Sequence, residues 1–422
     1  MARKVQRRDV LKTAGVAGAA GLAGCISSLT GDGTGTEDGG GGGSRTINYG
    51  VLLPLTGDLG SVGKPMRDAA VLPGKQLDGA DLGGLSVESQ VEDTATSPQT
   101  GIQAANSLVN NGVPGICGPA SSGVNIQVAK QVFIPNQVVG CSPSSTSPAV
   151  TDLDDDGYIF RTAPSDALQG QVLGQIASDR VNASTAATLY VNNDYGQLLS
   201  QEFTKAFENN GGEVLQEVAF QKQQSSYTSK IQSALDGDPD ALLVIGYPAS
   251  GIQLFKDYYD DYSADRDILL TDGLRDPKIA KQVGADLSNI RGSAPQPSGP
   301  AADSFASQFQ DEYDTEPGIF NAHSYDASAS LILANAAGGE NSGTAIRDNM
   351  QAIANPDGEE ITASNLAKGV RMAKNGEAIM YEGASSSVDY DDNGDVASDM
   401  VIVGVEDGEF VDQRTIPAED LV

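Results

Sequence analysis

The alternation of short apolar runs with amphipathic segments constrains the fold of this chain more than any other feature. Residues 47–55 and 138–142 are apolar and rich in β-branched side chains, as buried strands are. Residues 97–112 have helical spacing, with a proline near the start and a glycine at the end. A repeated order of strand, helix and strand is typical of a parallel sheet with helices on both faces. Because this pattern runs through two blocks of similar length, the sequence predicts two such sheets.

The ends of the predicted strands carry small, hydroxyl-bearing and aromatic residues and few acids. Ligands of open parallel sheets bind outside the carboxyl ends of the strands, so these residues mark the expected binding surface. The segment from Gly140 to Val150 contains no charged side chain, although the formal charge of the whole chain is −31. Loops rich in Ser and Thr often serve only as caps and turns. Neutral hydroxyls and amides at a helix start can, however, bind an anionic group without pairing with the protein's own acids.

The fold class predicted from this pattern is α/β, with two doubly wound parallel-sheet lobes joined by crossover hinge strands. We assign residues 46–163 together with about 293–400 to lobe 1, and residues 164–292 together with about 401–422 to lobe 2. Two lobes that the chain crosses more than once suggest a cleft between hinged bodies. Residues 385–405 are predicted to form a β-hairpin near the end of the chain.

The first residues indicate export rather than a folded domain. Arg7-Arg8 precede a short run of small apolar residues, in a pattern that resembles a twin-arginine signal over residues 1–24. The segment that ends at Cys25 resembles a lipobox, which implies a lipid attached to Cys25 after cleavage. A chance arginine pair before a small-residue run is the alternative. Residues 25–45 are rich in Gly and Asp and predict a flexible tether, which would hold a soluble body at the outer face of the cell membrane.

The charge balance of the chain is strongly acidic, with 57 Asp and Glu residues against 26 Lys and Arg residues. Nucleic acid is therefore not expected as a partner, because its phosphates would be repelled. The acids are spread along the chain, as on a solvated surface. This composition resembles that of proteins from extreme halophiles, and it predicts that molar salt is needed to screen the self-repulsion.

Seven segments, in their order along the chain, resemble the branched-chain amino-acid-binding proteins (leucine/isoleucine/valine type) of ABC importers, which have the type I periplasmic-binding-protein fold. The resemblance extends from about residue 46 to the end of the chain. One departure is Pro73-Gly74, inside the first expected helix, which should kink or shorten that helix. The segments are GVLLPLTGDLGSVG (50–63), GICGPASSG (115–123), GCSPSSTSPAVTDL (140–153), YIFRTAPSD (158–166), LYVNNDYGQ (189–197), IGYPASG (245–251) and YDA (325–327).

The resemblance also implies which residues bind the ligand. Tyr195 and Tyr247 match residues of the second lobe that close over the ligand, and Asp272 falls where the family places the acid that binds the α-ammonium. This acid is commonly Glu in the family, so Asp272 reaches about one methylene less far. Hydroxyls and backbone amides of the first lobe would hold the α-carboxylate. Ser144 and Ser145 would act mainly through their backbone. The first-lobe residues implied in this way are Ser122, Ser144, Ser145 and Thr146.

The function implied by the resemblance is capture of a small amino acid, hydrophobic or branched-chain, and its delivery to an ABC-transporter permease. The two lobes would close over the ligand like a clamshell, and the protein would act as a monomer without a cofactor. Other members of the family bind amides, urea or aromatic acids, which remain alternatives. The same fold also serves as the ligand domain of sensors.

A hydrolase or a metal protein is less well supported by the sequence. The only histidine is His323, and no serine lies in the pattern G-x-S-x-G. Residues 152–157 and 389–394 resemble the start of a calcium loop, but the twelfth positions are Ala163 and Met400 instead of Glu. We therefore expect acidic turns there, no metal and no catalysis.

Cys117 and Cys141 each lie two residues before a proline, at the end of a predicted strand. If these strands are parallel neighbours, the two thiols lie side by side, and an extracytoplasmic location would permit a disulfide. Adjacent parallel strands rarely offer good disulfide geometry, so two buried thiols are the favoured alternative.

Overall fold

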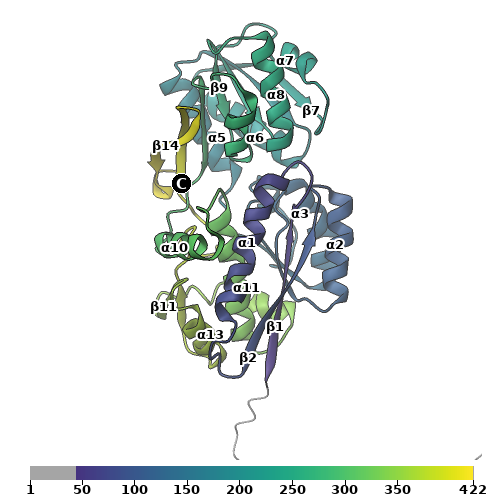
Figure 1. Ribbon diagram of the computed structural model, residues 1–422, viewed down its shortest axis with the longest axis vertical. Coiled ribbons are helices and arrows are strands. Elements are labelled where there is room, and N and C mark those ends of the chain that lie inside the picture. The colour runs from purple at the N-terminus through teal and green to yellow at the C-terminus, as the bar shows by residue number, and fades with distance from the viewer. Residues whose placement is uncertain (1–43, 422) are drawn as a thin grey trace, which may run out of the picture. The chain divides into compact units, whose positions relative to one another are not determined.

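A computed structural model of the chain describes residues 44–421 (Figure 1). The predicted export signal, the lipid-bearing Cys25 and nearly all of the predicted tether lie outside the described residues. Within the described range, no helix combines the length and the apolar character needed to cross a bilayer.

The first sheet has five strands within the described range, all parallel, in the order β2-β1-β3-β4-β5. Alternate residues of β1 point to opposite faces, as the period of a strand requires. Tyr49 and Val51 belong to the core on one face, and Leu52 belongs to the core on the other. We call the part of the chain built on this sheet lobe 1. Its strands are β1 (Arg45–Leu53), β2 (Leu85–Asp93), β3 (Gly115–Cys117), β4 (Val139–Ser142) and β5 (Ile159–Arg161).

Helices cover both faces of the first sheet. One core joins β1 to α1 (Gly60–Leu77) and α11 (Asn321–Gly338), and the other joins it to α2 (Pro98–Asn110) and α3 (Ser122–Val128) (Figure 1). Nearly every residue of α11 is buried, because α1, α12 and α13 pack around it. Lobe 1 also contains α4 (Pro148–Thr151), α10 (Ala302–Tyr313), α12 (Gly343–Met350), α13 (Leu366–Lys374), β11 (Glu359–Ile361) and β12 (Ile379–Tyr381).

The second sheet, on which lobe 2 is built, has seven strands in the described part of the chain. Five of them are parallel, in the order β7-β6-β8-β9-β10, and β13 and β14 extend the sheet antiparallel beside β10. The predicted fold class of two parallel-sheet α/β lobes is therefore confirmed. The strands are β6 (Thr185–Val191), β7 (Glu213–Phe220), β8 (Ala241–Ile245), β9 (Asp267–Leu270), β10 (Ile290–Pro295), β13 (Met400–Glu406) and β14 (Glu409–Ile416). The helices are α5 (Asp166–Gln175), α6 (Asp194–Asn209), α7 (Thr228–Ala234), α8 (Pro248–Asp261) and α9 (Pro277–Val283).

The predicted hairpin over residues 385–405 is wrong. The hairpin at this end of the chain is β13–β14, and it turns at Asp407-Gly408, where both residues have positive φ. An Asp-Gly pair suits such a tight turn because it tolerates this backbone conformation. The earlier Asp-Asn-Gly stretch forms a local turn instead, in which the amide of Asp391 donates to the carbonyl of Asp395 over 2.9 Å.

The chain crosses between the two sheets three times, after β5, after β10 and before β13. The two lobes are thus interleaved rather than consecutive along the chain. Pro73-Gly74 was predicted to kink or shorten the first helix, α1. The helix is not shortened, because it continues to Leu77. Pro73 is buried there, and the hydroxyl of Tyr49 donates to the carbonyl of Ala70 over 3.2 Å, in the same stretch of the helix.

Candidate functional site

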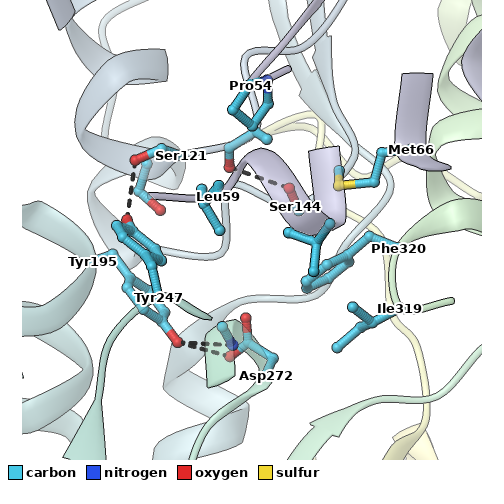
Figure 2. A pocket seen from close by; sticks show the side chains of 14 residues that line it. Pro54, Leu59, Met66, Ser121, Ser144, Tyr195, Tyr247, Asp272, Ile319 and Phe320 are labelled. Atoms are coloured by element: carbon cyan, nitrogen blue, oxygen red, sulfur yellow. Dashed lines mark hydrogen bonds between the residues drawn. The ribbon is translucent and has the colours of Figure 1, made fainter. Parts of the chain in front are cut away.

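A pocket lies where the carboxyl ends of strands from both sheets face each other (Figure 2). It contains about 420 Å³ of space between atoms, part of which is continuous with solvent. Lobe 1 contributes Ser121, Ser122 and Ser144, and lobe 2 contributes both predicted tyrosines and the predicted acid. Five of the seven predicted ligand-binding residues therefore line it, namely Ser122, Ser144, Tyr195, Tyr247 and Asp272.

The serine-rich loop after β4 is tied to the loop after β3 by hydrogen bonds from its own hydroxyls. The hydroxyl of Ser142 donates to the carbonyl of Pro119 over 2.6 Å and accepts the amide of Ser145 over 3.0 Å. The hydroxyl of Ser144 donates to the carbonyl of Ala120 over 3.2 Å. These bonds fix the two loops against each other and leave Ser144 at the pocket wall (Figure 2).

Ser145 and Thr146, the other two predicted residues, do not line the pocket. Both are buried, and neither hydroxyl has a hydrogen-bond partner among residues 44–421. Their neighbour Ser147 links the loop after β4 to the start of α3, because its amide donates to the hydroxyl of Ser122 over 3.3 Å. Any role of Ser145 and Thr146 in binding therefore falls to their backbone.

The two tyrosines of lobe 2 stack on each other, with ring centroids 5.6 Å apart and planes inclined by 11°. Tyr195 lies in the first turn of α6, and Tyr247 directly precedes α8. The hydroxyl of Tyr247 lies 3.0 Å from the hydroxyl of Ser121, across the gap between the lobes. The tyrosines therefore form one wall of the pocket, and Tyr247 also joins lobe 2 to lobe 1 (Figure 2).

Asp272 begins a short 3₁₀ turn directly after β9 and is 4% exposed. It accepts a hydrogen bond from the hydroxyl of Tyr195 over 3.0 Å (Figure 2). Burial raises the pKa of Asp272 to about 6, although the hydrogen bond from Tyr195 acts in the opposite direction. A cationic ligand group would stabilise the ionised form of this carboxylate, because its charge compensates for the hydration lost on burial.

A second buried acid, Asp166, lies close to Asp272 and was not predicted as a site residue. It is the first residue of α5, and neither of its side-chain oxygens has a hydrogen-bond partner in the described part of the chain. Burial, together with the charge of Asp272, raises the pKa of Asp166 well above its usual range. The signal was present in the sequence, because Asp166 ends one of the segments that carry the family resemblance.

The apolar side of the pocket was also not predicted. It is formed by Leu59, Val62 and Met66 before and within α1, and by Ile319 and Phe320 before α11 (Figure 2). Phe320 has a φ of 61°, a left-handed conformation that is strained for a bulky residue. Strain of this kind persists where the surrounding structure holds a side chain in place. Here the strained residue is one of those that line the pocket.

Further contacts hold the two lobes together beside the pocket. The hydroxyl of Ser250 in lobe 2 lies 2.9 and 2.8 Å from the two carboxylate oxygens of Asp58 in lobe 1. The ammonium of Lys222 donates to the carbonyl of Thr96 over 2.6 Å. With the bridge at Tyr247, these bonds describe lobes that are closed on each other.

The residues considered for hydrolysis or metal binding lie in the core or in local turns. Neither ring nitrogen of His323 has a hydrogen-bond partner among residues 44–421, and burial lowers the pKa of His323 to about 3. The carboxylates of Asp155 and Asp391 accept amides of their own turns, from Gly157 over 2.9 Å and from Asn393 over 2.8 Å. Within the described range, no three His, Cys, Asp or Glu residues gather as metal ligands.

Cys117 and Cys141 are register partners on the adjacent parallel strands β3 and β4. Both are fully buried and occur as free thiols in the structure. The thiol of Cys117 faces the carbonyl of Ser324 at 3.6 Å, and the thiol of Cys141 faces the hydroxyl of Tyr390 at 3.5 Å. The thiols thus pack in the core of lobe 1.

Comparison with known proteins gives a consistent result. The profile of a family described as periplasmic binding protein matches residues 46–405. Over 372 residues, the chain is 26% identical to the chemotactic signal transduction system substrate-binding protein BasB of Halobacterium salinarum, which covers 82% of this chain and 83% of that protein. It is 28% identical over 245 residues to the leucine-, isoleucine-, valine-, threonine-, and alanine-binding protein of Pseudomonas aeruginosa, covering 57% of this chain and 58% of that protein. The solved leucine binding protein LivK of Thermotoga maritima shares the fold, with a TM-score of 0.76 at 22% identity over 89% of this chain and 100% of that chain.

Proposed function

The chain belongs to the periplasmic binding protein family, and from this premise we propose that it captures a small amino acid with an apolar side chain and delivers it to an ABC-transporter permease. The observation that carries the proposal is the separation of chemical character within one pocket. Uncharged hydrogen-bond donors lie on lobe 1, the carboxylate of Asp272 lies on lobe 2, and apolar side chains complete the lining. An amino acid has the matching anion, cation and apolar group.

The hydroxyl of Ser122 and the backbone amide of Thr146 are the donors for the ligand's carboxylate, while Ser144, whose hydroxyl donates to the carbonyl of Ala120, lines the pocket. Hydrogen bonds to a charged group contribute about 1.5–3 kcal/mol each, so a few of them suffice to orient a small ligand. Asp272 and the hydroxyl of Tyr195 receive the ammonium. The side chains of Leu59, Met66 and Phe320 then surround an aliphatic side chain.

The order of binding follows from the positions of these groups. The ligand first meets lobe 1 through its carboxylate, and lobe 2 then swings in with Tyr195, Tyr247 and Asp272. Closure around a hinge is the usual motion of two lobes joined by crossing strands. The closed form, held by the bridges at Tyr247 and Ser250, is the form that docks on the permease.

The cellular setting belongs to the same proposal. Export through the signal in residues 1–24 and a lipid on Cys25 would place the protein outside the cytoplasm, and the tether would hold it near the permease. We further infer that molar salt stabilises the fold by screening the net charge of −31. A melting temperature that is the same in molar and in millimolar KCl would contradict this inference.

The proposal is tested by measuring thermal shifts with leucine, isoleucine, valine, leucinamide, benzoate and urea in molar KCl. Leucine or a close relative is expected to raise the melting temperature most. Asp272→Asn should then weaken binding of that amino acid about tenfold or more in titration calorimetry, because a charge-assisted bond is lost. Asp286→Asn, at a surface acid of the same lobe that accepts the amide of Ser288, is the control. Unchanged affinity in Asp272→Asn contradicts the assignment, and stabilisation by benzoate or urea alone favours the other ligand classes.

A second candidate function uses the same pocket. The relative from Halobacterium salinarum is named for chemotactic signal transduction, so presentation of the closed form to a sensory transducer is the alternative to delivery for transport. Deletion of the gene separates the two. Loss of amino-acid uptake supports transport, and loss of chemotaxis with intact uptake supports sensing.

A further inference from the structure

Arg161, the last residue of β5, is fully buried beneath the serine-rich loop of lobe 1. One nitrogen of its guanidinium, Nη1, donates to three consecutive carbonyls of this loop. The distances are 3.2 Å to Ser145, 3.1 Å to Thr146 and 3.0 Å to Ser147. Three successive carbonyls of the loop therefore point toward one side chain.

The opposite edge of the guanidinium is bound by Asp395, which lies 234 residues further along the chain. Nε and Nη2 of Arg161 donate to Oδ1 and Oδ2 of Asp395, each over 2.6 Å, and Nη2 also donates to the hydroxyl of Thr151 over 2.6 Å. The amide of Asp395 is itself held by the carboxylate of Asp391 over 2.9 Å. The guanidinium is thereby fixed in one plane, and its charge is balanced without a contact to the pocket.

The direction of the carbonyls determines the direction of the neighbouring amides. In a planar trans peptide, the carbonyl and the following N–H point in opposite directions. Because the carbonyls of Ser145 and Thr146 point to Arg161, the amides of Thr146 and Ser147 point away from it. The amide of Ser147 meets the hydroxyl of Ser122 over 3.3 Å, and Ser122 lines the pocket. The amide of Thr146 donates to no residue that the structure describes.

We propose that Arg161 is a positioning residue for recognition of the ligand's carboxylate. It holds the loop so that the amide of Thr146 and the hydroxyl of Ser122 face the anion, and Asp395 holds Arg161 in turn. The inference rests on the proposed function, because it assumes a ligand whose carboxylate binds to lobe 1. It extends that function, because the pocket's preference for an anion would depend on Arg161, which does not touch the ligand.

The contribution of Arg161 is geometric rather than one of net charge. Its ion pair with Asp395 cancels the charge of the guanidinium at a distance, but only a planar fork with five donors makes this set of bonds. A lysine at this position keeps the charge and loses the fork. A cation inside the pocket would instead pair with Asp272 and block the ligand's ammonium site.

The test compares leucine with leucinamide, which keeps the ammonium and the side chain but lacks the carboxylate. Arg161→Lys is expected to raise the Kd for leucine at least tenfold and the Kd for leucinamide less than threefold, as measured by calorimetry. Arg291→Lys is the control, because Arg291 pairs with Asp267 at the amino end of β10 in lobe 2. It should leave the ratio of the two Kd values unchanged.

Asp395→Asn provides a second variant in case Arg161→Lys does not fold. Arg161 stays in place in this variant but loses the negative charge and one of its two bonds at residue 395, so a smaller rise in the Kd for leucine, about threefold or more, is expected with little change for leucinamide. Equal weakening of leucine and leucinamide in both variants overturns the inference and leaves the proposed function intact. A wild-type protein that binds neither leucine nor another carboxylate overturns both.

Discussion

The hydroxyl of Tyr247 in lobe 2 lies 3.0 Å from the hydroxyl of Ser121 in lobe 1. The side-chain amide nitrogen of Asn193 donates to the same tyrosine oxygen over 2.9 Å. Either hydroxyl can donate in the contact between Tyr247 and Ser121, because a phenol oxygen that accepts from Asn193 can still accept or donate a second bond. The contact therefore links lobe 2 to lobe 1 through two successive hydrogen bonds, and it exists only while the lobes are closed.

Tyr247→Phe removes this bridge and keeps the ring that stacks on Tyr195. A net loss of about 1 kcal/mol predicts an affinity for the amino acid that is about fivefold weaker, measured by titration calorimetry. Tyr227→Phe is the matched control, because the Tyr227 hydroxyl is bonded within lobe 2, to the carbonyl of Gln221 over 3.2 Å. Equal effects of the two substitutions would show that the bridge does not stabilise closure.

Ligand binding should weaken in mild acid. Burial raises the pKa of Asp272 to about 6 in the ligand-free protein, so the group gains a proton as the pH falls from 7 to 5. A neutral Asp272 loses its charge-assisted bond to the ammonium, and the affinity is expected to fall about tenfold below pH 6. Calorimetry between pH 5 and pH 8 measures this. In Asp272→Asn the same pH step should have little effect, and an equal slope in both proteins would point to another group.

Asp272 should destabilise the ligand-free protein near neutral pH. Its folded-state pKa lies above the unfolded value, so its contribution to stability is present below the unfolded pKa and is lost as the pH rises through about 6. A shift of about two pKa units corresponds to about 3 kcal/mol. Asp272→Asn should therefore raise the free energy of unfolding by up to about 3 kcal/mol at pH 7.5 and by little at pH 4, as measured by urea denaturation. A variant that is less stable than the wild type at both pH values would contradict this.

Ser250→Ala should impair closure through Asp58. The substitution leaves both carboxylate oxygens of this buried acid without their hydroxyl partner, at a cost of about 1–3 kcal/mol. Since the contact joins the two lobes, the expected loss appears in ligand affinity and dissociation rate, while the melting temperature of the ligand-free protein changes little. Ser200→Ala, which removes a hydroxyl bonded to Thr188 within lobe 2 at 2.7 Å, should show the reverse. Stopped-flow dissociation and thermal melts separate the two outcomes.

The two thiols of lobe 1 should be inert in the folded protein. Burial raises the pKa of Cys117 to about 12, and burial also raises the pKa of Cys141. A thiol reagent is expected to modify both only after unfolding, at the global unfolding rate, in a Cys25→Ser background without reductant. Modification of neither thiol in denaturant would reveal a disulfide instead.

Much of the fold could be predicted because local patterns determine it. The strand predicted at residues 47–55 is β1 (Arg45–Leu53), since a β-branched apolar run suits the interior of a parallel sheet. The hairpin was misplaced for the opposite reason. The Asp-Asn-Gly turn has the right local chemistry, but the apolar run after it pairs with β10, about 110 residues earlier, and the sequence contains no signal for that pairing.

The polar half of the site followed from the motifs, because its residues lie in the loops and first helical turns that follow strands. These residues are Ser122, Ser144, Tyr195, Tyr247 and Asp272. The supporting contacts could not be found in this way. Arg161 lies in one of the segments that carry the resemblance, but it meets Asp395 only through the tertiary fold, and Phe320 reaches the pocket from a loop between helices. Side chains that act through distant partners leave no periodic trace in a sequence.

The large separation of β13 from β10 along the chain has a consequence for biosynthesis. Strand β13 pairs with β10 and carries β14, so β10 remains an open edge until residues 400–416 have been made. The core of lobe 1 is also completed late in synthesis, because it contains the almost entirely buried helix α11. The chain must therefore be made to about residue 338 before α11 can cover the first sheet, and a product that ends before residue 400 would leave β10 as an unprotected, aggregation-prone edge.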